Sequence, residues 1–281
     1  MVVAAWARPP RRTTRGHMSR KNPTMINDYR EDAARFYDLW ADPYDDVSFY
    51  RAQLPSPEAD VLELGCGTGR VLLPMAESCR FIHGIDHSPG MLDICQRKLD
   101  DAQIAPGRAR IEQGDITALD LGRTFDLITA PFRVMQNLET DAQIAGLLDT
   151  IRRHLAPQGT AILNTFFPRD DKQTLMERWE KRDGTEYFYK DTSIGRMRMT
   201  DDCRRFQSDP FVMFPVLRYE LLKNDKVIES AELPISMRVW YPDELLDVIT
   251  AAGFRVTGRF GGYAGEPWGE GNELVVTFTH G

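Results

Sequence analysis

The stretch "VLELGCGTGR", from Val61 to Arg70, places three glycines at alternate positions directly behind a run of aliphatic residues. The aliphatic run predicts a buried strand, and residues 70–78 predict the helix that follows it. Glycines at such a turn leave the backbone bare, so that a ligand can approach the free N–H groups at the start of the helix. We therefore expect a ligand-binding turn at this point of the chain.

A dinucleotide-binding turn is one alternative, because it also follows the first strand of a doubly wound sheet. Its pattern is G-x-G-x-x-G, and counting from Gly65 and Gly67 puts Arg70 where the third glycine belongs. The third glycine of this chain, Gly69, stands one position too early. The spacing therefore argues against a dinucleotide such as NAD.

Strands and helices alternate along the chain on both sides of the glycine turn. Apolar runs predict further strands at 80–86, 109–115, 125–132, 160–167, 255–260 and 272–280, and helical periodicity predicts helices at 33–40, 89–102, 141–159 and 241–254. This alternation predicts right-handed βαβ units. We expect an α/β fold with a Rossmann-like, doubly wound, mostly parallel sheet of seven strands.

The alternation stops after Pro168, where a helix is followed by successive runs that predict antiparallel strands. We expect an inserted, antiparallel β cap at 168–240 that shapes the substrate site, and a ligand-binding domain made of 26–167 and 241–281. The first 25 residues contain six Arg or Lys and no acidic residue, and they predict a disordered basic tail at 1–25.

The composition favours small-molecule ligands. A net charge of −7 argues against a general nucleic-acid binder, which needs a dominant basic face. The four cysteines show no CxxC spacing, so neither a disulfide framework nor a metal site is expected, and a reducing, cytoplasmic setting follows. No apolar run approaches the roughly 18 residues of a membrane-spanning helix, and no membrane association is expected.

The pattern Glu63-x-Gly65-x-Gly67-x-Gly69 resembles the first motif of the class I S-adenosylmethionine-dependent methyltransferases of small-molecule type. The resemblance implies that the glycine turn binds S-adenosylmethionine as the cofactor. It also gives Glu63 a role, since this carboxylate would face the methionine part of the cofactor, whose ammonium group a dinucleotide lacks.

Residues at the ends of the next two strands fit the same resemblance. Asp86 ends the second strand, where the family binds both ribose hydroxyls with a carboxylate. Asp115 follows Gly114 after the third strand, where the family accepts a hydrogen bond from the adenine amino group, and the N–H of Ile116 would reach the ring. A purely structural alternative for Asp86 is that it caps the helix that begins near Pro89.

Further cofactor contacts are implied by the resemblance, each with packing as the alternative. His87 and Met91 would border the adenine, and Phe132 would line the space near the transferable methyl group. Related enzymes close over the cofactor with N-terminal helices, which here carry Tyr37, Tyr50 and Arg51.

The substrate pocket is expected between the fourth strand and the cap. Arg133 and Gln136 follow the fourth strand, and the cap supplies Tyr187, Tyr189, Tyr219 and Trp240. In the run "RMRM" a strand would put Arg196 and Arg198 on one face and Met197 and Met199 on the other. The aromatic residues are equally compatible with the hydrophobic face of the cap, and the arginines with a solvated outer face.

The acceptor chemistry is open between nitrogen, oxygen and carbon, because this fold hosts all three. No histidine lies in the cap, which disfavours a histidine-assisted O-methyltransferase, whereas an amine attacks once it is neutral. We expect direct in-line N-methylation of a small metabolite without a metal, and a possible homodimer through the cap. The alternatives are O- or C-methylation, a non-catalytic protein that binds S-adenosylmethionine, and an RNA methyltransferase, against which the acidic total counts.

Overall fold

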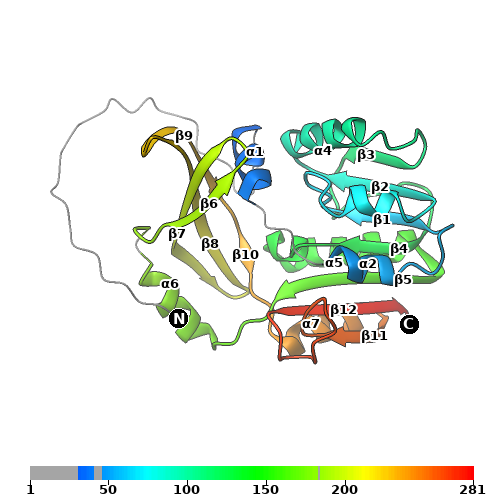
Figure 1. Ribbon diagram of the computed structural model, residues 1–281. Helices are drawn as coiled ribbons and strands as arrows, with labels where there is room; N and C mark the ends of the chain where they lie inside the picture. Colours follow the sequence, from blue (N-terminus) through cyan, green and yellow to red (C-terminus); the bar gives the residue numbers. More distant parts are fainter. Residues whose placement is uncertain (1–30, 41–45, 183) are drawn as a thin grey trace.

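The computed structural model describes residues 31–40, 46–182 and 184–281, which form two separate sheets (Figure 1). The predicted basic tail lies outside the described residues. Sheet A contains the strands β1 (Asp60–Leu64), β2 (Phe81–Asp86), β3 (Ala109–Gln113), β4 (Phe125–Ala130), β5 (Leu155–Phe166), β11 (Phe254–Phe260) and β12 (Glu273–His280).

The strand order of sheet A is β11-β12-β5-β4-β1-β2-β3, and β12 runs in the direction opposite to the other six strands. The predicted mostly parallel, doubly wound sheet of seven strands is thereby confirmed. The chain order reverses between β1 and β4, which pair in parallel. At such a switch point the loops leave the strands in opposite directions and open a crevice at the carboxyl edge of the sheet.

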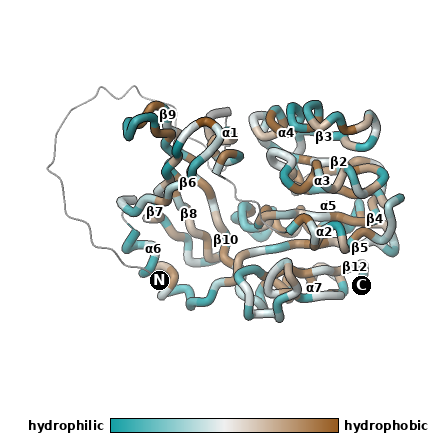
Figure 2. Tube along the Cα trace, in the orientation of Figure 1, coloured by the Kyte–Doolittle hydropathy of each residue, from teal (hydrophilic) through white to brown (hydrophobic). Residues whose placement is uncertain are grey.

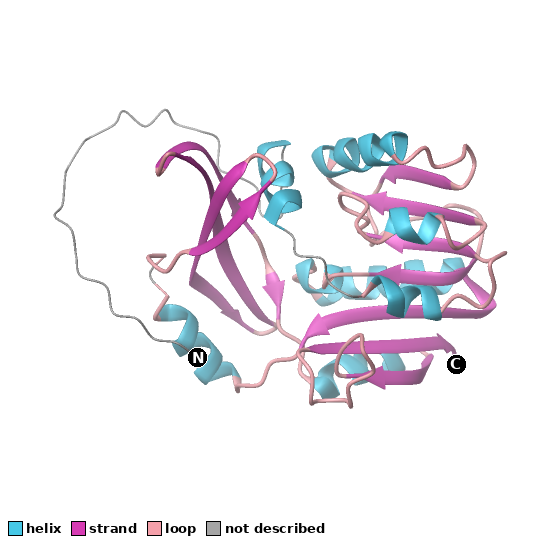
Figure 3. Cartoon of the chain, viewed as in Figure 1, coloured by secondary structure: helices cyan, strands magenta, loops and turns pink. Residues whose placement is uncertain are grey.

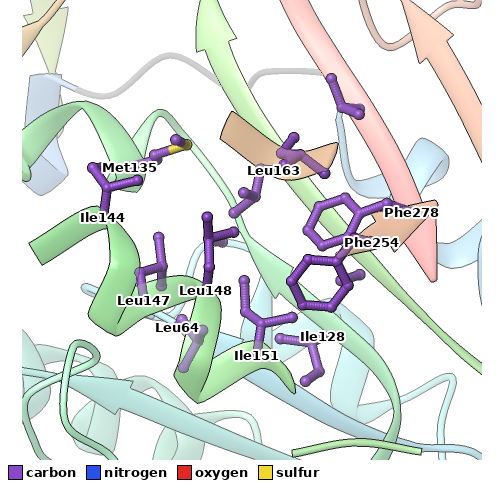
Figure 4. Close-up of a cluster of buried hydrophobic side chains, with 14 of the residues drawn as sticks. Leu64, Ile128, Met135, Ile144, Leu147, Leu148, Ile151, Leu163, Phe254 and Phe278 are labelled. Atoms are coloured by element: carbon purple, nitrogen blue, oxygen red, sulfur yellow. The ribbon is translucent and has the colours of Figure 1, made fainter. Parts of the chain in front are cut away.

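Helices cover both faces of sheet A, because its strands are hydrophobic on both sides (Figure 2). One face packs against α2 (Val47–Ala52), α3 (Leu72–Ala76) and α4 (Pro89–Asp101). The other packs against α5 (Asp141–His154) and α7 (Pro242–Ala251), and Figure 4 shows this core, with Leu147, Leu148 and Ile151 of α5 beside Ile128 and Phe254 of the sheet. The result is a three-layer α/β/α arrangement.

Helix α5 ends five residues earlier than the sequence pattern predicts. Leu155 already has extended backbone angles and pairs with Phe125 of β4. The ring of His154, which is fully buried, fixes this end, because its Nε2 accepts a hydrogen bond from the N–H of Leu121 at 2.8 Å. Pairing with β4 therefore overrides the helical periodicity, and Pro157 could not have continued the helix.

The inserted residues form the antiparallel sheet B (Figure 3). Its strands are β6 (Phe188–Thr192), β7 (Gly195–Ser208), β8 (Phe211–Lys223), β9 (Lys226–Pro234) and β10 (Met237–Arg238), and the helix α6 (Lys172–Glu180) leads into it. Strand β8 pairs with β7, β9 and β10, and β6 pairs with β7. The predicted antiparallel cap is confirmed as a sheet separate from sheet A, whereas its exact limits as a subdomain remain a prediction.

Helix α1 (Glu31–Trp40) lies between the cap and the helix α4, so it joins the two parts of the molecule (Figure 1). Ala33 and Phe36 pack against sheet B, while Ala34 and Tyr37 pack against α4. These positions alternate with helical periodicity, which is why both faces of this short helix are buried.

Candidate active site

A cavity of about 470 Å³ lies at the carboxyl edge of sheet A. Its lining comes from α1, the glycine turn, the loops that follow β2, β3 and β4, and the first turns of α4 and α5. The lining residues are Tyr37, Gly65, Gly67, Asp86, His87, Met91, Gly114, Asp115, Ile116, Thr117, Pro131, Phe132, Val134, Asn137, Leu138, Glu139 and Gln143. The cavity therefore occupies the switch point at which this class of sheet binds ligands.

Gly67 and Gly69 are needed at the turn for different reasons. Gly67 has a φ of +54°, and a Cβ atom built on it would meet nothing within 4 Å, so this position faces open space in the cavity. A Cβ atom on Gly69 would lie 2.4 Å from Leu73 and 2.6 Å from the sulfur of Cys95. Gly67 thus leaves room for a ligand, and Gly69, which does not line the cavity, lets the turn pack against α3 and α4.

Asp86 is fixed at the end of β2 by backbone donors. Its Oδ2 accepts from the N–H of Gly67 at 2.8 Å, and its Oδ1 accepts from the N–H of Ser88 at 2.9 Å. The N-cap of α4 is Ser88, whose hydroxyl accepts from the N–H of Met91. The capping role weighed for Asp86 therefore belongs to Ser88, and the buried carboxylate of Asp86 borders the cavity.

Glu63 lies on β1 and is almost fully buried. Burial raises the pKa of its carboxyl group well above the usual range, with a smaller opposing effect of Arg70. Its Oε2 has no hydrogen-bond partner among the described residues. Glu63 is not among the cavity-lining residues, so it stands behind the glycine turn as a buried carboxyl group with an unused acceptor.

The loop after β3 carries the other predicted cofactor residues. Oδ1 of Asp115 accepts from the N–H and the hydroxyl of Thr117 at 2.8 and 2.7 Å. Ile116 lines the cavity beside it, and Met91 and His87 line it from α4 and the loop before α4. Nδ1 of His87 lies 3.6 Å from Oδ1 of Asp86. The structure thus gathers these residues around one space.

The loop after β4 has a strained backbone beside the cavity. Phe132 and Arg133 both adopt left-handed angles, with φ of +56° and +67°, which non-glycine residues rarely do. The N–H of Arg133 donates to Oδ1 of Asn164 at 3.1 Å, and its guanidinium pairs with Glu273. Glu273 also accepts from Nδ2 of Asn164 at 3.0 Å. This buried polar group holds the loop in a conformation that presents Phe132 to the cavity.

Arg70 occupies the position of the missing third glycine. Its guanidinium makes a bidentate pair with the fully buried Asp46, at 2.6 and 2.9 Å, and lies 5.0 Å from the ring centroid of Phe132. The ring of Phe132 in turn meets the ring of Tyr37 edge to face, with 6.2 Å between the centroids. Arg70 therefore supports one wall of the cavity, a role that no sequence signal indicated.

Two residues of the N-terminal region that are predicted to contact the cofactor lie away from the cavity. Tyr50 is fully buried in the hydrophobic core, with its ring packed against Phe49 and Tyr263. Arg51 points outward, and it donates to the carbonyl oxygen of Pro74 at 2.8 Å. Neither residue lines the cavity, because α2 packs on the face of sheet A and not over its edge.

None of the eight substrate candidates lines the cavity, and their role in substrate binding stays a prediction. Arg133 and Gln136 lie in the segment that follows β4 and anchor it to neighbouring strands. Nε2 of Gln136 donates to the carbonyl oxygen of Arg238 at 2.8 Å. Trp240 is buried in the core of sheet A, and Tyr219 stacks on Phe36 with 6.2 Å between the centroids.

The alternation predicted for "RMRM" is confirmed. Met197 is fully buried under α1, whereas Arg198 points to the opposite face of sheet B and pairs with Glu220. Four of the substrate candidates lie on or beside that opposite face, turned away from α1: Tyr187, Tyr189, Arg196 and Arg198.

The sequence interpretation missed four polar lining residues, Thr117, Asn137, Glu139 and Gln143. Thr140 and Gln143 form a capping box at the start of α5, and the corresponding T-x-x-Q pattern was the signal that would have placed this turn at the edge of the sheet.

The lining of the cavity is acidic. Asp86, Asp115 and Glu139 contribute carboxylates, and the described lining contains no Lys or Arg, with the imidazole of His87 as its basic group. Pyrophosphate ligands are bound by cationic side chains and free N–H groups, whereas carboxylates favour a cation. The charge of the lining therefore favours a cationic ligand.

Within the described ranges, no group of three or more His, Cys, Asp or Glu residues is arranged to hold a metal ion. Of the helices in this part of the chain, none has the length and apolar character needed to cross a membrane. The cysteines are free and buried.

Comparison with known proteins gives the same family as the motifs. Residues 61–159 match the model of a methyltransferase domain. The chain is 28% identical over 153 residues to dTDP-3-amino-3,6-dideoxy-alpha-D-glucopyranose N,N-dimethyltransferase of Streptomyces fradiae, covering 51% of this chain and 57% of that relative. It is 27% identical over 260 residues to cypemycin N-terminal methyltransferase of Streptomyces sp., covering 88% and 96%.

The first of these matches thus spans little more than half the length of the relative. Among solved structures, the CcbJ methyltransferase of Streptomyces caelestis superimposes with a TM-score of 0.71 at 21% identity, covering 90% of this chain and 98% of that chain. The fold thereby agrees over most of the chain. Residues 61–159 of this chain are thus a methyltransferase domain, and the fold is that of an S-adenosylmethionine-dependent methyltransferase.

Proposed function

We propose that this protein is an enzyme that transfers the methyl group of S-adenosylmethionine to the nitrogen of a small-molecule amine. The observation that carries the proposal is the cavity at the switch point of sheet A, with a bare glycine on one side and carboxylates on the other. The ribose hydroxyls and the adenine amino group of S-adenosylmethionine are donors that such carboxylates can accept.

The chain offers a partner for each part of the cofactor. In this proposal Gly67 leaves room at the turn, Asp86 accepts from both ribose hydroxyls, and Asp115 with Ile116 binds the adenine; the open space at Gly67 and the cavity-lining positions of the other three support it. Glu63 has an unused buried acceptor behind the turn, which suits the methionine ammonium group. These assignments rest on the family motif together with the positions of the side chains.

When bound, S-adenosylmethionine supplies a methyl group that its sulfonium has already activated. The protein therefore has to orient an acceptor in line and exclude water. Phe132 and Tyr37 form an aromatic wall, and Phe132 is held by the Arg133, Asn164 and Glu273 group. This wall is suited to excluding water from the methyl group and to fixing its orientation.

The protein groups around the cavity favour an amine acceptor. Among the described histidines, only His87 lines the cavity, and it lies beside the proposed ribose position. Burial raises the pKa of the Tyr37 phenol, so this group stays protonated at neutral pH and is no base. An amine that loses its own proton needs no such base.

The relatives point in the same direction, since one is named as an N,N-dimethyltransferase of an amino sugar and the other as an N-terminal methyltransferase. We also infer that the cap at 168–240 covers the acceptor and supports a homodimer. The large hydrophobic side chains that are exposed in the described chain all lie in the cap, at Tyr187, Phe188, Tyr189, Ile194, Val227 and Ile228. A cytoplasmic location and the absence of nucleic-acid or membrane partners remain predictions from composition.

The test is calorimetric titration with S-adenosylhomocysteine, with NAD as the control, followed by transfer of labelled methyl groups to pooled amines, phenols and carboxylic acids. Binding of S-adenosylhomocysteine and transfer to the amine pool is the expected result. Transfer to phenols or carboxylic acids only would replace the N-methylation proposal with O-methylation. Binding without transfer to any pool would favour a non-catalytic binding protein.

A further inference from the structure

Helix α1 forms part of the wall of the cavity through Tyr37, and the next residue makes an unusual set of contacts. Oδ1 of Asp38 accepts from the hydroxyl of Thr68 at 2.7 Å and from Nζ of Lys98 at 2.5 Å. Thr68 is 3% exposed, and it stands between Gly67 and Gly69 in the glycine turn. One carboxylate thus connects α1 to the turn and to α4.

The opposite side of α1 is attached to the cap by apolar contacts. Phe36 and Trp40 both pack on the ring of Tyr219, with centroids 6.2 and 6.1 Å away. Nζ of Lys190 also donates to the carbonyl oxygen of Trp40 at 2.8 Å. The cluster around them includes further side chains of the cap, Met197, Leu221 and Leu233.

The attachment of α1 to the Rossmann-like part is smaller and more polar. Its apolar component is a cluster in which Ala34 and Tyr37 pack on Met91 and Ile94 of α4. A polar component is the carboxylate of Asp38, and Tyr37 also meets the ring of Phe132 edge to face. The cluster on the cap side of α1 contains more side chains than the cluster on the α4 side. The Asp38 contacts therefore help to set how closely Tyr37 approaches the cavity.

We propose that Asp38 is a positioning residue that ties α1 to the glycine turn and holds Tyr37 over the bound cofactor. The proposal rests on the proposed cofactor site. Without Asp38, α1 remains attached to the cap, and its hydrogen bond to Thr68 of the glycine turn is lost. The carboxylate thereby couples the cofactor turn to the cap, which lies on the far side of the same helix.

Charge-assisted hydrogen bonds in a partly buried setting are the strong ones, and the side chains of Asp38 and Lys98 are 27% and 34% exposed. We expect Asp38→Ala to raise the Kd for S-adenosylhomocysteine about tenfold, mainly through a faster dissociation rate. The matched control is Arg35→Ala, which removes an ion pair of α1 with Glu229 on the cap side, and it should bind like the wild type.

The measurement is the dissociation rate and Kd of S-adenosylhomocysteine for the wild type and both variants, with thermal unfolding to compare folding stability. If the wild type does not bind, the proposed function fails, and Asp38 has no cofactor to position. If the wild type binds and Asp38→Ala binds equally well, the positioning role is overturned while the proposed function stands.

A second variant tests the same contact if Asp38→Ala folds poorly. Thr68→Val removes the hydroxyl at the other end of the contact with little change in shape, and it should also speed dissociation. The double variant should lose less than the sum of the single losses, because both changes break the same contact. A dissociation rate in Thr68→Val equal to that of the wild type would contradict the proposal. So would a loss of affinity in the double variant equal to the sum of the two single losses.

Discussion

The backbone N–H of Gly67 donates a 2.8 Å hydrogen bond to Oδ2 of Asp86. This bond joins the glycine turn after β1 to the end of β2, so a single carboxylate both orders the turn and borders the cavity. The two strands are neighbours in sheet A, and their pairing places the residues together. The proposed ribose acceptor is thus held in place by the fold before any ligand binds.

Replacing Asp86 with alanine should weaken the binding of S-adenosylhomocysteine by about 1–3 kcal/mol, because the ribose hydroxyls lose their acceptor. Calorimetric titration measures this change. Asp93→Ala removes the same side chain from an exposed position on α4 and serves as the control. Equal affinities of Asp86→Ala and the wild type would show that the ribose lies elsewhere.

Gly67→Val should abolish binding of S-adenosylhomocysteine, because the new side chain would fill the space that is open to the cavity. The control is Gly122→Val, since Gly122 has a similar φ of +62° and equally open surroundings but does not line the cavity. Both variants carry a comparable backbone strain of about 1–2 kcal/mol. Titration of the two proteins separates the strain from the filling of the site, and retained binding in Gly67→Val would mean that the turn does not face the cofactor.

Glu273→Ala should lower the free energy of unfolding by about 1–3 kcal/mol and slow methyl transfer. The change leaves Arg133 and Asn164 without their shared acceptor, and the left-handed loop that presents Phe132 loses its support. The stability loss stays moderate because the Arg133 side chain is 31% exposed, so water replaces part of the interaction. Urea unfolding and initial rates measure the two effects, and a variant that is less stable but transfers methyl at the normal rate would show that Phe132 needs no such support.

The fold was predictable because its signals are local. Alternating apolar runs gave the strands, and the carboxyl ends of parallel neighbours meet at one edge, which is why Asp86 and Asp115 were found from their positions after β2 and β3. The boundary of α5 was missed because pairing of Leu155 with β4 outweighs helical periodicity.

The substrate residues of the cap could not be predicted in the same way. Sequence alternation separates the two faces of a strand, as Met197 and Arg198 show, but it does not tell which face is turned toward the rest of the molecule. That choice depends on α1, a helix more than 150 residues earlier in the chain, which packs on the face with Met197 and Tyr219.

Alkaline pH should destabilise the protein through its buried tyrosines. Burial raises the pKa of Tyr219 in the folded state, whereas in the unfolded chain a tyrosine titrates near 10. The contribution of this neutral phenol to stability is therefore complete below about pH 10 and is lost as the pH rises further, by about 1.4 kcal/mol per pH unit for one proton.

Unfolding free energies measured in urea between pH 8 and 11 should fall less steeply for Tyr219→Phe than for the wild type. Identical slopes for Tyr219→Phe and the wild type would mean that Tyr219 ionises as readily in the folded chain as in the unfolded one.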